Sequence, residues 1–475
     1  MNKIKSLAGD TVLYGLGSII PRTLNFFLVV LHTRIFIPEE YSVVVNVYAW
    51  VAFLNIVYAF GMETAYFRFA TRDGADEQKV FRITQTFVLA ISFTLSFTIA
   101  LFAAPIANYF DVGQHVDFIY WVAAIMFVDA AVSIPFAQLR LKRKALIFAS
   151  AKIVNVIIVI ALNFYFLTIS YDATIGVGYV LLANLIANLF YVIFFLRTLV
   201  SWRPAMDKTI FSSMFRYAFP IMLTGLTGMI NEMFSRITLE AWLPPGQDAA
   251  HSLGVFGACF RFAVIMNLAV QAFRFAAEPF FFSHASDKNS PELFAKVNHY
   301  FTILCCFILL SVVVNMDILK YLLNDTYWEG LGIVPILLIG YMFLGIYYNM
   351  SVWFKLTDKT YFGTIITTGG AVITIVLNYL LIPRFGYIGS SWATLLCYFL
   401  MAAACYVLGQ QFRPIPYKVL GGLAYLFYAI VLIEIANLLS LPSPYLATGF
   451  HFALMAVFLV TVFWRERKYW NTQVG

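Results

Sequence analysis

The sequence predicts an all-α integral membrane protein with about 14 transmembrane helices, and three observations support this. Hydrophobic residues make up 62% of the 475 residues and charged residues only 12%, whereas about a quarter of the residues in a soluble domain are charged. About fourteen stretches are long enough to cross a bilayer, which takes roughly 20 apolar residues each. Basic residues cluster in every second gap between these stretches. A soluble globular protein is therefore excluded, and the net charge of +7 needs no nucleic-acid partner, because cytoplasmic loops account for it.

The predicted spans follow one another with short loops on both sides of the membrane. The longest exterior gap, around residues 244–252, is far too short for a folded domain. The first apolar stretch has no cleavable signal-peptide pattern, so we expect it to remain as the first span. We place the spans at approximately residues 11–36, 43–67, 82–108, 116–138, 149–170, 174–197, 211–238, 252–284, 294–322, 331–354, 360–383, 387–410, 417–438 and 445–464.

The distribution of basic residues predicts the orientation in the membrane. Of the 31 Lys and Arg, 25 lie at the two ends of the chain or in even-numbered gaps, and four lie in odd-numbered gaps. Lys and Arg accumulate in cytoplasmic loops, so both termini and every even-numbered gap are expected in the cytoplasm. The remaining two, Arg22 and Arg261, fall inside predicted spans.

The two halves of the chain repeat at an offset of 215 residues. Glu63 matches Glu278 at this offset, and the basic segment that begins at Arg140 matches the one that begins at Lys355. Chance similarity among apolar helices is the alternative, but the matches agree over six spans. The same offset relates Leu162-Asn163 to Leu377-Asn378.

The repeat predicts two pseudo-symmetric six-helix lobes, residues 1–200 and 211–412, joined by a cytoplasmic linker at 201–210. Residues 413–475 then hold two appended helices, thirteen and fourteen, and a cytoplasmic tail. Six is an even number, so both repeats enter from the cytoplasmic side and are related by an axis along the membrane normal. A transport site is expected between the lobes, near the midplane.

Arg22 and Arg261 are the strongest candidates for a binding site. Arg22 lies about eleven residues, or roughly 16 Å, from the cytoplasmic end of its helix, and Arg261 is similarly deep from the exterior. A guanidinium at the bilayer centre costs at least ~2.5–3.5 kcal/mol, so each needs a water-filled cavity or a carboxylate. Asp129, the only acidic residue near the midplane by these boundaries, can pair with one arginine only. The other makes the cavity net positive, which suits an anion and phosphate in particular.

Further polar residues lie on the same helices. Ser18, Arg22 and Asn25 share one helical face in the first span, and Asn231 belongs to a polar stripe in the seventh. Such faces line a cavity or make interhelical hydrogen bonds. In the first span Arg22 favours the cavity, and in the seventh both interpretations stay open.

Two carboxylates lie near the cytoplasmic ends of their spans. Glu63 in the second span and Glu278 in the eighth are either gate salt bridges or plain interfacial charges. No metal-ligand spacing and no nucleotide-binding or hydrolase motif occurs, so we expect no cofactor and no enzymatic activity.

Several segments resemble the polysaccharide-type flippases of the multidrug/oligosaccharidyl-lipid/polysaccharide exporter superfamily. One departure is Ser42, where the family usually has glycine after the Glu39-Glu40-Tyr41 element. The resemblance covers most of the chain, but its motifs are loose and apolar. The segments that carry it are Ile37-Pro38-Glu39-Glu40-Tyr41, Gly61 to Phe69, Leu162-Asn163, Leu377-Asn378, Leu381-Ile382-Pro383 and Gly386-Tyr387-Ile388-Gly389.

The resemblance implies two six-helix lobes in a V and alternating access. It implies that an undecaprenyl-diphosphate-linked oligosaccharide moves from the inner to the outer leaflet of the bacterial cytoplasmic membrane, for surface polysaccharide biosynthesis. Arginines in helices one and eight line the cavity of the related lipid II flippases, and Arg22 and Arg261 occupy comparable helices. The expected partners are this lipid and membrane lipids, with a monomeric protein and transient contacts to polysaccharide assembly proteins. Substrate-binding residues are then Arg22, Arg261, Asn25, Ser18 and Asn231, and coupling or gating residues Asp129, Glu63 and Glu278.

Other functions remain as alternatives. A lipid II flippase differs only in its substrate, and the Pro38-Glu39-Glu40-Tyr41 signature favours the surface-polysaccharide class. A cation-coupled multidrug exporter predicts twelve spans and an acidic cavity, which two intramembrane arginines oppose. A membrane-embedded enzyme acting on the same lipid usually needs a sizeable exterior loop with catalytic residues, and the sequence has none.

Overall fold

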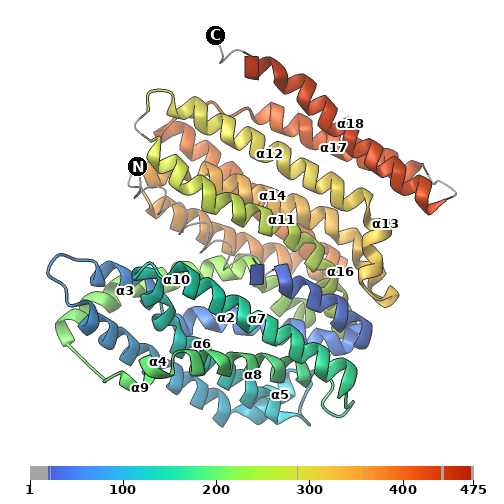
Figure 1. The fold of residues 1–475 in the computed structure, drawn as a ribbon. Coiled ribbons are helices and arrows are strands. Elements are labelled where there is room, and N and C mark those ends of the chain that lie inside the picture. The colour runs from blue at the N-terminus through green and yellow to red at the C-terminus, as the bar shows by residue number, and fades with distance from the viewer. Residues whose placement is uncertain (1–19, 22, 286, 358, 440–442, 472–475) are drawn as a thin grey trace. The chain divides into compact units, whose positions relative to one another are not determined.

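The computed structural model describes residues 20–21, 23–285, 287–357, 359–439 and 443–471, and within them the chain forms helices and no strand (Figure 1). Ten helices in these residues are long and apolar enough to cross a membrane, and the apolar helices Thr23–Ile35 and Gly178–Phe194 are shorter. The prediction of an all-α integral membrane protein is confirmed. The number fourteen stays a prediction, although every predicted stretch falls on helical chain among these residues.

Two structural details contribute to the difference between the fourteen predicted spans and the ten long apolar helices. The helix α16 (Tyr361–Phe412) holds two predicted spans, because its backbone leaves the helical region at Gly386, with φ 55° and ψ −136°. The helix α10 (Lys208–Trp242) covers the predicted span 211–238 but is too polar to count among the ten.

The chain divides into two compact units. Unit 1 contains the residues up to Ala258 together with Thr367–Ser390. In this unit α6 packs between α4 and α8, α7 packs on α8, and α10 packs along α2 and α3 (Figure 1). Its helices are α2 (Pro38–Ala59), α3 (Met62–Ala70), α4 (Glu77–Leu101), α5 (Ala103–Tyr109), α6 (Val116–Leu141), α7 (Ala145–Phe164), the π-helix η1 (Tyr165–Ile169), α8 (Gly178–Phe194), α9 (Leu196–Ser201), α10, the start of α11 (Ala249–Ser283) and the middle of α16.

Unit 2 contains Cys259–Ile366 and the residues from Ser391 onward. In this unit α12 packs against α14, α17 and α18. Its elements are the rest of α11, α12 (Ser290–Val314), α13 (Met316–Leu319), η2 (Lys320–Leu322), η3 (Asp325–Gly332), α14 (Ile333–Met350), α15 (Val352–Leu356), the two ends of α16, α17 (Val419–Leu438) and α18 (Pro444–Asn471). The units therefore follow helix packing rather than the sequence repeat, and the two-lobe division stays a prediction.

The helix predicted at 43–67 is broken into α2 and α3. Phe60 and Gly61 both have positive φ, 50° and 68°, and the chain turns there. A Cβ on Gly61 would lie 2.7 Å from the carbonyl oxygen of Ala218 in α10. Glycine at this position therefore allows both the turn and the close packing of α10.

The predicted linker at 201–210 is tied to α4. Lys79 Nζ donates to Asp207 at 2.7 Å, and the backbone N–H of Ala205 donates to Thr86 at 3.1 Å. Asp207 also accepts from the first backbone N–H groups of α10, as a helix N-cap does. The hydrogen bond from Lys79 and these N–H groups hold the pKa of Asp207 below its ordinary value.

Candidate functional site

The residues predicted to bind the diphosphate lie in different parts of the chain. Ser18 and Arg22 lie outside the described residues. Asn25 is exposed on the helix Thr23–Ile35, and Arg261 is half-buried in α11, within unit 2. Whether Arg22 and Arg261 act on one ligand therefore stays a prediction.

Asn231 is buried in unit 1, where it bridges α10 and α16. Its amide donates to the carbonyl oxygen of Thr367 at 3.1 Å, and its Oδ1 accepts from the hydroxyl of Thr374 at 3.1 Å. These bonds are the ones that the interhelical alternative predicts. A role in substrate binding stays a prediction for this residue.

A second buried amide, that of Asn378, lies one helical turn after Thr374 in α16. Asn378 Oδ1 accepts from the hydroxyls of Ser235 in α10 and Ser390 in α16, at 3.2 and 3.1 Å. Its Nδ2 donates to the backbone carbonyl four residues earlier, at Thr374, over 2.8 Å. Asn378 and Ser390 are fully buried, so this network joins α10 to α16 in the interior of unit 1.

The repeat-related residue Asn163 makes the equivalent bonds. His32 Nε2 lies 2.9 Å from Asn163 Oδ1, and Asn163 Nδ2 donates to the carbonyl of Val159 at 2.8 Å. Asn163 is also fully buried. In both halves, the fifth helix of the repeat thus bonds through an asparagine to the helix that opens the repeat.

Asp129 belongs to a polar cluster of α6, α7 and α8. Its Oδ1 accepts from Asn188 Nδ2 at 3.0 Å, and Asn155 donates to Asn188 Oδ1 at 3.3 Å. Among the described residues the cation that acts on Asp129 is Lys152 in α7. The ammonium of Lys152 lies 4.8 Å from the ring centroid of Tyr191. A pairing of Asp129 with Arg22 falls outside the described residues.

Lys152 was not predicted as part of this cluster. Lys152 belongs to the group of basic residues assigned to the cytoplasmic gap, although it lies at the start of the predicted span 149–170. The helix α7 begins at Ala145, so Lys152 is about two turns inside it. The available signal was the segment itself, since an apolar run follows Ala145 directly and a lysine within such a run needs a counter-charge.

Glu63 and Glu278 form ion pairs, each inside its own unit. Glu63 at α3 pairs with Arg140 at the end of α6, and Glu278 in α11 pairs with Lys355 in α15 at 2.6 Å. Arg274 adds a longer contact of 3.8 Å to Glu278. The offset that relates Glu63 to Glu278 also relates Arg140 to Lys355. The repeat is therefore visible in side-chain pairing. Salt bridges, one of the two open interpretations, are present within each unit, and a role in gating stays a prediction.

The described residues contain no group of three or more His, Cys, Asp or Glu placed to hold a metal ion. The arrangement consists of interhelical hydrogen bonds, intramembrane cations and ion pairs near helix ends. Such groups bind and position a ligand in a transporter, where polar residues lie along the substrate path.

Solved structures of membrane proteins share the fold of this chain. The chain is similar to the lipid II flippase MurJ in an inward closed conformation, with 14% identity and a TM-score of 0.75 over 96% of this chain and 99% of that one. It is similar to an inward-facing multidrug resistance MATE family transporter of the MOP superfamily, with 15% identity and a TM-score of 0.65 over 84% and 97%. The outward-facing form gives 15% identity and a TM-score of 0.58 over 86% and 95%. The fold is thus that of multi-pass membrane proteins of this superfamily.

The sequence family is more specific. Residues 31–327 match the family described as Polysaccharide biosynthesis protein, and the chain belongs to this family. No curated protein matches the chain in sequence. The resemblance noted from the sequence motifs is confirmed at the level of family and fold.

Proposed function

We propose that this protein is a flippase that moves an undecaprenyl-diphosphate-linked oligosaccharide from the inner to the outer leaflet of the bacterial cytoplasmic membrane. The observation that carries the proposal is a polysaccharide biosynthesis family match over residues 31–327 in a chain with a MOP-type fold. The family points to sugar polymers, and the fold points to movement across a membrane. The protein acts as a transporter and not as an enzyme.

The chemistry of the intramembrane residues supports an anionic substrate. Arg261 is half-buried in an apolar helix, and Arg22 lies in the first predicted span. Each guanidinium binds a diphosphate through paired N–H donors, which a point charge cannot match. Ser18 and Asn25 share a helical face with Arg22 and supply further hydrogen bonds, and Asn231 in α10 is a further candidate for the same role.

No nucleotide-binding motif occurs, so transport draws on the membrane potential, an ion gradient or consumption of the product. An inside-negative potential favours outward movement of negative charge by about 2.3 kcal/mol per charge per 100 mV. Asp129 is then a coupling residue that resets the empty carrier. Glu63 and Glu278 hold the cytoplasmic helix ends through their ion pairs and act in gating.

Complementation of a flippase-deficient strain tests the binding residues. Arg22→Ala and Arg261→Ala each remove charge-assisted hydrogen bonds of about 1.5–3 kcal/mol, which weakens diphosphate binding about ten- to hundredfold. Both variants are expected to accumulate in the membrane without complementing, and lysine at either position rescues partly. Arg384→Ala is the matched control, because Arg384 is exposed in a predicted exterior gap. Normal complementation by both alanine variants contradicts the anionic-substrate argument.

A lipid II flippase is the second candidate function. The similarity to MurJ over 96% of the chain favours it. Expression in two conditional strains separates the candidates, one depleted of its lipid II flippase and the other of its polysaccharide flippase. Rescue of the second strain only is the expected result, and rescue of the first alone would assign lipid II as the substrate.

A further inference from the structure

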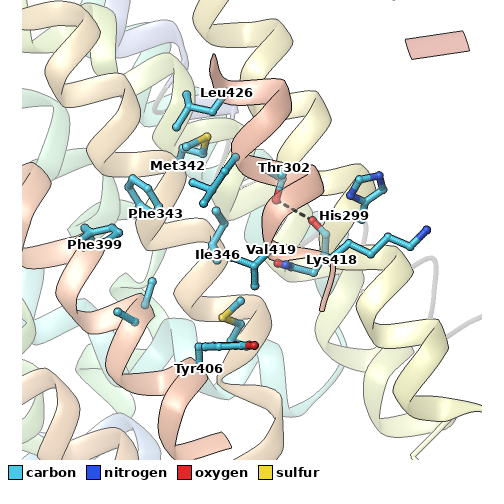
Figure 2. A pocket seen from close by; sticks show the side chains of 16 residues that line it. His299, Thr302, Met342, Phe343, Ile346, Phe399, Tyr406, Lys418, Val419 and Leu426 are labelled. Carbon is cyan, nitrogen blue, oxygen red and sulfur yellow. Dashed lines mark hydrogen bonds between the residues drawn. The ribbon is translucent and has the colours of Figure 1, made fainter. Parts of the chain in front are cut away.

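Unit 2 contains an apolar cavity between α12, α14, the end of α16 and the start of α17 (Figure 2). Its volume is about 270 Å³. Most of its lining is hydrocarbon. Met342, Phe343, Ile346, Phe399, Leu423 and Leu426 contribute this apolar lining.

A polar pocket of about 560 Å³ adjoins this cavity. Both are lined by His299, Tyr406, Lys418 and Val419, so they are neighbouring parts of one groove. The polar part adds Arg465 and the residues around it at the end of α18. We call the whole the α12–α17 groove.

The charges in the polar part favour an anion. The carboxylate of Glu466 is buried, 2% exposed, and accepts from the Tyr425 hydroxyl at 2.8 Å, with His299 Nε2 at 3.2 Å. Glu466 lines this part as well, but Tyr425 and His299 already bind its Oε1, so one engaged carboxylate faces two cations of the same lining. Lys418 and Arg465 are exposed at the rim and present two positive charges to whatever enters.

Two buried polar atoms of the lining lack a hydrogen-bond partner among the described residues. They are Nδ1 of His299 and the hydroxyl of Tyr417. Buried polar atoms nearly always have a hydrogen-bond partner. Two such atoms without one mark a place where a polar group of a ligand, or water, is accommodated. Both His299 and Tyr417 line the polar part of the groove.

The groove lies where inner-leaflet lipids are found. The positive-inside pattern places Lys418 before helix thirteen and Arg465 after helix fourteen on the cytoplasmic side. On α17, Leu420 and Phe427 are 83% and 68% exposed, as expected for side chains that face acyl chains. Basic pockets between transmembrane helices on this side bind anionic lipid headgroups.

We propose that the α12–α17 groove is a binding site for an anionic phospholipid of the inner leaflet. The phosphate contacts Lys418 and Arg465, and one acyl chain lies along the apolar lining between α14 and α17. Arg261 is not among the residues that line the groove, and the proposal does not depend on the identity of the transported molecule. It assigns a membrane lipid to unit 2 as a resident ligand.

Binding of phosphatidylglycerol to the purified full-length protein tests the proposal, with native mass spectrometry as the measurement and phosphatidylcholine as the zwitterionic comparison. The double variant Lys418→Gln/Arg465→Gln is expected to bind phosphatidylglycerol about thirtyfold more weakly, from the usual contribution of two basic residues near an anionic lipid. Ala403→Phe, which fills the apolar part with both charges intact, is expected to weaken binding of the same lipid. Size-exclusion profiles verify that each variant is folded.

The matched control is Arg203→Gln/Lys208→Gln, which removes the same charge from exposed positions in the linker. It is expected to bind phosphatidylglycerol like the unmodified protein. Equal binding by the groove variant and the control overturns the proposal, as does equal affinity for phosphatidylcholine. Undecaprenyl phosphate serves as a competitor: if it binds and phosphatidylglycerol does not, the groove holds an isoprenoid lipid and the proposal is wrong.

Discussion

Replacing Glu63 and Arg140 by glutamine, singly and together, measures how much their ion pair contributes to the packing of α3 against α6. The two side chains are 41% and 33% exposed, and a pair this exposed contributes about 0.2–1 kcal/mol, because water screens the attraction. The guanidinium of Arg140 also lies over the rings of Phe67 and Phe148, 5.0 and 5.8 Å from their centroids. Each such contact adds about 0.5–1 kcal/mol at an exposed site.

The two single replacements therefore have unequal costs. Glu63→Gln removes only the ion pair and is expected to cost about 0.2–1 kcal/mol. Arg140→Gln removes the ring contacts as well and is expected to cost about 1–3 kcal/mol. The coupling energy of the double-mutant cycle stays below about 1 kcal/mol, because the ring contacts belong to Arg140 alone.

For the repeat-related pair Glu278–Lys355 in unit 2, we expect the glutamate replacement to cost more stability than the replacement of the basic partner. Glu278 contacts two cations, Lys355 at 2.6 Å and Arg274 at 3.8 Å. Glu278→Gln loses both attractions, whereas Lys355→Gln leaves Arg274 in place. The glutamate replacement is thus the more costly one in unit 2 and the less costly one in unit 1.

Apparent melting temperature in detergent, followed by fluorescence size-exclusion after heating, is the assay. About 1 kcal/mol corresponds to roughly 2–4 °C for a unit of 150–250 residues. Additive replacements in both cycles, or equal losses from Glu63→Gln and Arg140→Gln, would refute the reasoning. Loss of transport in a variant that keeps its melting temperature assigns a gating role in addition.

Three further predictions concern topology, packing and the polar cluster. Reporter fusions after Lys208 and after Lys468 are both expected to report cytoplasm, and an exterior signal from either breaks the assigned orientation. Gly254→Leu is expected to lose about 3 kcal/mol or more and give little monodisperse protein, since even a Cβ there would lie 1.9 Å from the first carbonyl oxygen of α2; normal yield contradicts this packing. Asp129→Asn is expected to cost up to about 3 kcal/mol, because Lys152 loses its counter-charge, and adding Lys152→Met should recover part of it. If Asp129 resets the empty carrier, the same variant loses vesicle transport more than diphosphate-lipid binding, and unchanged transport makes it purely structural.

The fold class could be predicted from the sequence because a bilayer imposes length and hydropathy on every span. Breaks inside spans could not be predicted, because one or two residues in the left-handed region, as at Phe60 and Gly61, leave the apolar pattern unchanged. The beginning of α2 at Pro38 is a similar case. Proline and two acidic residues are common in the first turn of a helix, but their low hydropathy makes this turn resemble a loop in a hydropathy profile.

The candidate site could be predicted only in part. Residue spacing identified Glu63 and Glu278 as equivalent, but the partners of each glutamate depend on how helices pack. Asn231 had two open interpretations, and only the positions of Thr367 and Thr374 reveal that its amide is used between helices. Lys152 was counted with the loop charges although it lies just inside the predicted span 149–170, and α7 begins earlier still, at Ala145.

The buried asparagines constrain how the helices can move. Asn378 binds its own helix through Nδ2 and α10 through Oδ1, and Asn163 stands in the same relation to His32. If the helix that carries His32, or α10, rotates about its own axis, the buried asparagine opposite it loses its hydrogen bond. Neither water nor lipid can replace that bond at a buried position. We therefore expect each opening helix to move together with the fifth helix of its repeat, with the hinges of a conformational cycle elsewhere in the chain.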